Sequence, residues 1–121
     1  MGDSIRRFRQ RVESLPVASR RLLCLIARQA SHGPLLSKDP GVATMPELHE
    51  ACGLEVDSMQ SLLHALQTAE LITIEGTYPF EEIRLAPWIP MSTILKRCEA
   101  AGLPVETVVV DLRFDLVTVV D

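Results

Sequence analysis

Apolar residues in the first part of the chain recur every three or four positions, which is the period of an α-helix. The first stripe consists of Ile5, Phe8, Val12 and Leu15. After Pro16, which a first helical turn tolerates, residues 17–30 repeat the pattern. We therefore predict an amphipathic helix over residues 3–15, with arginines on its other faces, and a buried central helix over residues 17–30.

Two shorter helices joined by a tight turn are predicted further along. Thr44 and Glu47 have the spacing of a capping box, in which each side chain accepts or reaches the other residue's amide. Gly53 stands where a helix end needs left-handed backbone. The next helix is expected to begin at Asp57 or Ser58. Two short helices around a turn that contains Gly predict a helix-turn-helix.

The second helix of this pair has two distinct faces. Its apolar positions predict a buried stripe of Met59, Leu62, Leu63, Leu66 and Ala69. The opposite face is polar and is made of Ser58, Ser61, His64, Gln67 and Thr68. This polar face is the part of the helix that is left to meet a partner.

A loop precedes the helix-turn-helix and a hairpin follows it. Residues 31–43 are rich in Gly, Pro and Ser and predict a loop, with a short strand at 35–36. After the second helix, residues 71–74 and 82–85 have the β-branched, apolar pattern of strands. The turn signal at 76–79 lies between them, so the sequence predicts a β-hairpin.

The C-terminal part has a different character. Residues 91–101 predict a short helix that Gly102 closes. Residues 105–121, VETVVVDLRFDLVTVVD, are strongly β-forming and predict either one long strand or two strands folded at 113–115. Because an exposed apolar strand invites aggregation unless it is paired, we expect it to pair with a second copy in a homodimer.

The stretch PELHEACGLEVDSMQSLLHALQTAELITIEG resembles the core of winged helix-turn-helix proteins such as the MarR- and ArsR-type bacterial regulators, and the resemblance covers about residues 16–86. The matching positions are Leu48, Ala51, Gly53, Leu62, Leu63, Leu66 and the run Glu70, Leu71, Ile72. The expected fold is α+β and mainly α: a winged helix-turn-helix domain over 1–87 that includes the basic N-terminal helix, and a helix-plus-strand extension over 88–121. The resemblance implies that the second helix enters the major groove of DNA.

Charge is distributed unevenly along the chain. Residues 1–28 hold seven arginines against two carboxylates, a balance of +5, so with a formal net charge of −4 the rest of the chain carries −9. From Asp39 to Glu82 the chain contains Asp and Glu but no Lys or Arg. Such asymmetry bears on the kind of partner.

Several function classes are disfavoured by the composition. The sequence has no apolar run of membrane-spanning length and no signal peptide pattern, so we expect a cytoplasmic protein without membrane contact. It has no glycine-rich phosphate loop and no nucleophile–base signature, so we expect neither an enzyme nor a cofactor. Cys24, Cys52 and Cys98 are scattered, which favours reduced thiols. His49 and Cys52 have the spacing of two metal ligands on a helix, but a surface His beside a core Cys is the commoner explanation, and we predict no metal.

The first functional hypothesis is a transcriptional regulator that binds double-stranded DNA. Ser, His and Gln side chains can hydrogen-bond base edges, while arginines must supply the phosphate contacts that dominate affinity. The candidate DNA-binding residues are Arg6, Arg7, Arg9, Arg11, Arg20, Arg21, Ser58, Ser61, His64, Gln67 and Arg84. This hypothesis requires the N-terminal arginines to provide phosphate contacts from a neighbouring helix or arm.

The alternative hypothesis is a protein–protein interaction module with an acidic face and no DNA binding. It accounts for the missing cations on the second helix, and it allows the C-terminal strand to join a partner's sheet. A third reading, a sensor of a ligand or metal through His49, Cys52, His64 or Cys98, has only composition in its favour.

Overall fold

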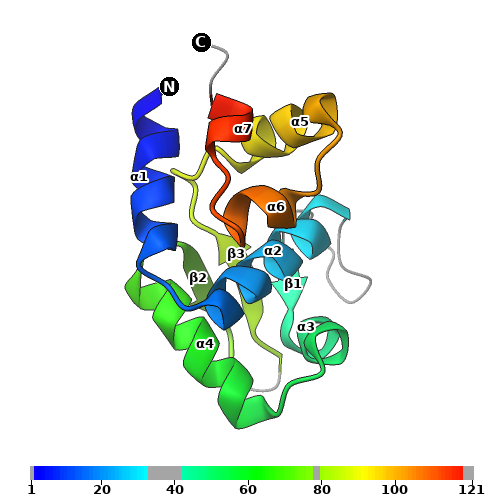
Figure 1. Ribbon diagram of the computed structural model, residues 1–121. Helices are drawn as coiled ribbons and strands as arrows, with labels where there is room; N and C mark the ends of the chain where they lie inside the picture. Colours follow the sequence, from blue (N-terminus) through cyan, green and yellow to red (C-terminus); the bar gives the residue numbers. More distant parts are fainter. Residues whose placement is uncertain (1, 33–41, 78–79, 119–121) are drawn as a thin grey trace.

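The structure is a computed structural model that describes residues 2–32, 42–77 and 80–118. It is an α+β arrangement, mainly helical, with one small antiparallel sheet (Figure 1). In chain order the elements are α1 (Gly2–Glu13), α2 (Val17–His32), β1 (Val42–Thr44), α3 (Met45–Cys52), α4 (Val56–Thr68), β2 (Ile72–Glu75), β3 (Glu82–Leu85), α5 (Met91–Ala101), α6 (Val105–Val109) and α7 (Asp115–Thr118). None of the described helices has the length and apolar character that a bilayer crossing requires.

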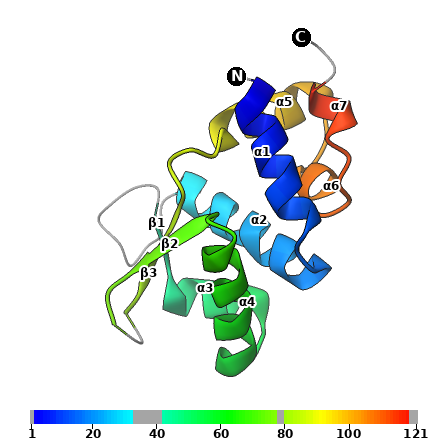
Figure 2. The same cartoon turned by 90° about the vertical axis from the view of Figure 1, so that its left-hand side faces the viewer.

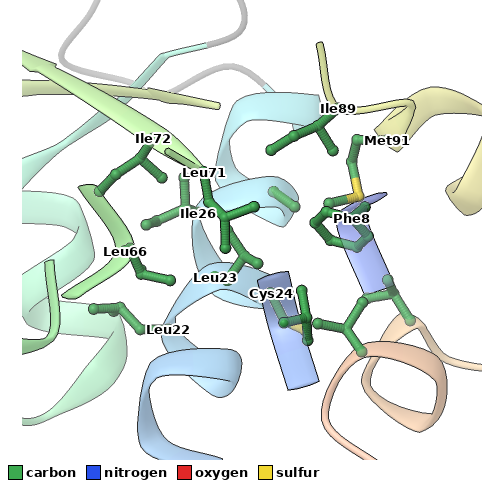
Figure 3. Packing of buried hydrophobic residues seen from close by; sticks show 14 of the residues in the cluster. Phe8, Leu22, Leu23, Cys24, Ile26, Leu66, Leu71, Ile72, Ile89 and Met91 are labelled. Atoms are coloured by element: carbon green, nitrogen blue, oxygen red, sulfur yellow. The ribbon is translucent and has the colours of Figure 1, made fainter. Parts of the chain in front are cut away.

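The central helix α2 organises the core. Leu22, Leu23 and Ile26 are almost fully buried, and they meet Leu66 of α4 and the residues at the start of β2 (Figure 3). One continuous cluster of buried side chains runs from Ile5 on α1 to Phe114 before α7. Residues from both predicted segments, 1–87 and 88–121, therefore contribute to the same core.

The sheet has the strand order β1-β3-β2, and both pairings are antiparallel. The hairpin of β2 and β3 confirms the predicted strands, with Ile72 opposite Leu85 and Ile74 opposite Ile83. The sequence does not predict strand β1, since its pattern favours a loop over residues 31–43. It has only three residues, and its partner β3 lies about forty positions further along the chain, so no local pattern announces it. The strand expected at 35–36 lies outside the described residues.

The turn between α3 and α4 confirms the prediction at Gly53. This residue has φ 67°, and its N–H donates to the carbonyl of His49 at 3.2 Å. The capping box at Thr44 is wrong in its predicted form: the Thr44 hydroxyl donates to the Glu47 carboxylate at 3.0 Å and makes no cap bond. Pro46 explains part of this, because it lacks one of the two amides that an N-cap oxygen can accept from. Helix α4 begins at Val56, slightly before the predicted start.

The strand prediction for the C-terminal part is wrong in the described residues, which form the short helices α6 and α7. Val105, Val108 and Val109 are buried at helical spacing, whereas a strand with one buried face would bury alternate positions. Packing inside the fold has therefore outweighed the β-preference of valine. The chain then reverses at Leu112, which has a positive φ of 59°.

The expectation of a homodimer rested on that predicted strand, so it has no support in the described residues. It relied on an exposed row of valines in need of a partner, but the valines of α6 are covered by the protein's own core. The last residues of the chain, 119–121, lie outside the described part.

Candidate nucleic-acid interface

Helix α4 presents the polar face that the sequence predicts. Ser58, Ser61, His64, Gln67 and Thr68 are all exposed. The opposite face is anchored in the core by the buried Met59, Leu63 and Leu66. The Ser61 hydroxyl donates to the Asp57 carbonyl at 3.1 Å, so its oxygen remains an acceptor toward a partner. The exposed face offers hydrogen-bonding groups and carries neither lysine nor arginine.

Carboxylates surround the N-terminal end of this face. Glu50, Glu55 and Asp57 are exposed there, and Glu75 is exposed on the hairpin. Arg84 is a cation on β3, but its side chain is half-buried and engaged in contacts within the fold. The N-terminal half of α4 is therefore an unfavourable place for a phosphate backbone.

Helices α1 and α4 lie on the same side of the molecule, with α1 beyond the C-terminal end of α4 (Figure 2). Two of its arginines reach the C-terminal end of α4: Arg7 Nη2 is 3.4 Å and Arg11 Nη2 is 3.9 Å from the carboxylate oxygens of Glu70. The structure thus brings Arg7 and Arg11 of α1 close to Glu70, just past the C-terminal end of α4. The DNA-binding hypothesis needs cations from a neighbouring helix or arm, and these two arginines lie at one end of α4.

The other candidate arginines are placed differently. Arg9 pairs with Glu13 on the same helix at 2.8 Å, and Arg6 is exposed. On α2, Arg21 is exposed beside an apolar groove of about 270 Å³ that Leu25 and Leu54 help to line. Arg20 is half-buried, and its Nε is buried without a hydrogen-bond partner. The ion pairs of Arg7 and Arg11 with Glu70 place these two candidates at the C-terminal end of α4.

Glu70 and Trp88 are two residues of this site that are not among the DNA-binding candidates predicted from the sequence. The guanidinium carbon of Arg7 lies 4.3 Å from the centre of the Trp88 ring, within cation–π range. Trp88 Nε1 donates to the backbone carbonyl of Glu70 at 2.9 Å. The contacts of Arg7 with Glu70 and Trp88 join positions that are more than sixty residues apart, so no spacing in the sequence could have indicated them.

The cysteines do not support a thiol or metal centre. Cys24 and Cys98 are free and buried. Burial, and next the Glu106 carboxylate, raises the pKa of Cys24 to about 12, and the same two causes raise the pKa of Cys98. Cys52 lies 3.7 Å from the sulfur of Met59. The part of the chain that the structure describes contains no group of three or more His, Cys, Asp or Glu residues placed to hold a metal ion.

We expect the three thiols to differ in reactivity. A pKa of about 12 instead of 9.0 reduces the thiolate fraction of Cys24 about a thousandfold at neutral pH, and Cys24 is also shielded from reagents. Iodoacetamide at pH 8 should therefore alkylate the half-buried Cys52 first in the native protein and all three equally in denaturant. Peptide mass spectrometry measures the rates, and equal native rates would contradict the burial of Cys24 and Cys98.

The raised thiol pKa also predicts how stability depends on pH. A group whose folded-state pKa is raised contributes stability that is fully present below its unfolded pKa. For Cys24 this contribution should be lost as the pH rises from about 9 to about 12.

Searches of protein-family models, of curated proteins and of solved structures found no match to this chain. Its function is therefore argued from the arrangement of α1, α4 and the hairpin.

Proposed function

We propose that this chain is a winged-helix protein that binds double-stranded DNA as a transcriptional regulator. Helices α3 and α4 are joined by the tight turn at Gly53 and are followed directly by the antiparallel hairpin of β2 and β3. This is the element order of a winged helix-turn-helix, in which α4 is the recognition helix and the segment between β2 and β3 is the wing. Such a role places the protein in the cytoplasm.

The observation that carries the proposal is the position of α1 beyond the C-terminal end of α4, where Arg7 and Arg11 lie close to Glu70 (Figure 2). Gln67 and His64 supply groups that can hydrogen-bond base edges. Arg6, Arg7 and Arg11 supply the cations for phosphate, which helix α4 lacks. Phosphate contacts fix the position of a protein on a duplex and base contacts give sequence preference, so the two helices have complementary roles.

The carboxylates restrict how the duplex is bound. Glu55 and Asp57 repel a phosphate backbone at the N-terminal end of α4. The duplex therefore lies over the C-terminal half of α4 and over α1. The proposal needs no second copy of the chain, although a dimer would double the number of arginines that face the DNA.

A titration with a fluorescently labelled random duplex at low salt tests this function. We expect binding that weakens steeply as salt rises, because each phosphate contact contributes about 0.9 to the slope of log K against log salt. The double variant Arg6→Ala with Arg7→Ala should flatten that slope by about two units. Fluorescence anisotropy measures both quantities.

Two controls accompany the titration. Lys96→Ala with Arg97→Ala removes an adjacent pair of cations from α5, away from α4, and should leave the slope nearly unchanged. His64→Ala should likewise keep the slope, since its role is toward bases. No binding of the wild-type protein at low salt, where electrostatic attraction is strongest, would overturn the proposal.

A second candidate function, a protein–protein interaction module, is favoured by the hairpin. Phe80 is 77% exposed beside the carboxylates of Glu81 and Glu82, next to a pocket of about 280 Å³ that Pro46 helps to line. An exposed aromatic side chain among carboxylates suits an apolar partner surface with a basic rim. The DNA titration separates the two candidates, because this one predicts no duplex binding at any salt concentration.

A further inference from the structure

Two arginines one helical turn apart converge on a single carboxylate. Arg7 and Arg11 each approach a different oxygen of Glu70, at 3.4 and 3.9 Å. Both distances exceed the 2.7–2.9 Å that is usual for charge-assisted hydrogen bonds. The side chains are also 39–60% exposed, so solvent weakens the attraction. The Glu70 carboxylate therefore holds this position only weakly.

The backbone of Glu70 is held firmly, in contrast with its side chain. Trp88 Nε1 donates to the Glu70 carbonyl, and the Glu70 N–H donates to the Gln67 carbonyl at 3.0 Å. Glu70 has φ 63°, in the left-handed region that favours glycine. A residue that carries a Cβ is disfavoured there, at the end of a helix where glycine is the usual choice. A strained position of this kind is a reason to look for a role of the side chain.

Arg7 is held in place independently of the Glu70 carboxylate. Arg7 stacks on the Trp88 ring, and the ring is fixed in turn by its own hydrogen bond. Arg11 is half-buried, on the same face of α1. Because guanidinium groups bind carboxylate and phosphate oxygens with similar geometry, a pair placed around a carboxylate also fits a phosphate.

We propose that Arg7 and Arg11 form a binding site for a DNA backbone phosphate, and that the Glu70 carboxylate occupies this site in the free protein as an intramolecular competitor. The inference rests on the proposed function, because it names the ligand of the same surface. On binding, the exposed Glu70 side chain turns toward solvent while its backbone stays fixed. Glu70 thereby lowers the affinity below what the arginines alone allow.

Glu70→Gln tests the competition while keeping the shape of the side chain. We expect it to tighten binding of random duplex about three- to tenfold at low salt, since it removes both the competing ion pair and the repulsion of phosphate. Glu75→Gln removes an exposed carboxylate from the hairpin and should change the affinity less than about twofold, as expected for a screened charge. Circular dichroism checks that both variants fold.

A second readout does not depend on DNA. Trp88 is the only tryptophan, and it contacts both Arg7 and Glu70, so its fluorescence reports on the site. In titrations with inorganic phosphate at constant ionic strength, Glu70→Gln should respond at several-fold lower concentration than wild type. Arg11→Ala should abolish the response.

The combined outcomes separate the inference from the function. Tighter duplex binding and a stronger phosphate response in Glu70→Gln support both. If Glu70→Gln binds duplex no more tightly than wild type, and binds phosphate no more tightly than wild type, the competition is overturned even when duplex binds. A phosphate response without duplex binding supports a phosphate site but overturns the proposal that its ligand is a phosphate of DNA. No response to either ligand overturns both.

Discussion

Phe114→Ala should lower the free energy of unfolding by about 3–5 kcal/mol, the usual cost of truncating a buried phenylalanine. The Phe114 side chain is fully buried, and its ring meets that of Phe8 edge to face, with the centres 5.9 Å apart. Removing it leaves a cavity between α1 and the C-terminal segment. Urea denaturation, analysed with a constant m-value, measures the change.

Phe80→Ala is the matched control, because the same substitution is made at a side chain that is 77% exposed. We expect a change within about 0.5 kcal/mol there. A double-mutant cycle with Phe8→Ala should give a coupling energy of about 0.5–1.5 kcal/mol for the ring pair. If Phe114→Ala cost as little as Phe80→Ala, the C-terminal segment would not be docked on α1.

The position of α1 connects this stability prediction to the site. Phe8 anchors the buried face of the helix in the core, and Arg7 and Arg11 lie near Glu70 on its other side. A loosened α1 would take its arginines away from α4. Phe114→Ala should therefore also weaken the proposed DNA binding, although it touches none of the proposed contacts.

The sequence predicts those elements whose apolar spacing is strictly periodic. Helices α1, α2, α4 and α5 and the hairpin strands follow from local patterns, with boundaries shifted by a few residues. The segment 105–118 shows why local preference can mislead. Its valines favour a strand by composition, but three of them are buried at positions that only a helix brings to one side.

The site was predicted in part. The polar face of α4 could be read from the sequence because burial of one helical stripe exposes the other. The proximity of Arg7 to Glu70 and Trp88 could not, because it results from how α1 packs on the finished core. Strand β1 could not be predicted for the same reason, because its residues form strand hydrogen bonds only once β3 is in place.

Leu66 and His64 lie two residues apart on α4, but their substitution by alanine should affect different properties. Leu66→Ala should affect stability, and His64→Ala should affect DNA binding. Leu66 is fully buried against α2, so its truncation should cost about 2–5 kcal/mol of stability, a large share of the roughly 5–15 kcal/mol of a typical domain. His64 is exposed, and its substitution should change stability by less than about 0.5 kcal/mol. Under the DNA proposal, His64→Ala should instead reduce the sequence preference of the protein among duplexes selected from a random pool. The Leu66→Ala molecules that remain folded should keep that sequence preference. Denaturation and competitive binding measure the two effects. A loss of stability in His64→Ala equal to that in Leu66→Ala would show that the polar face of α4 is packed inside the protein and does not face a partner.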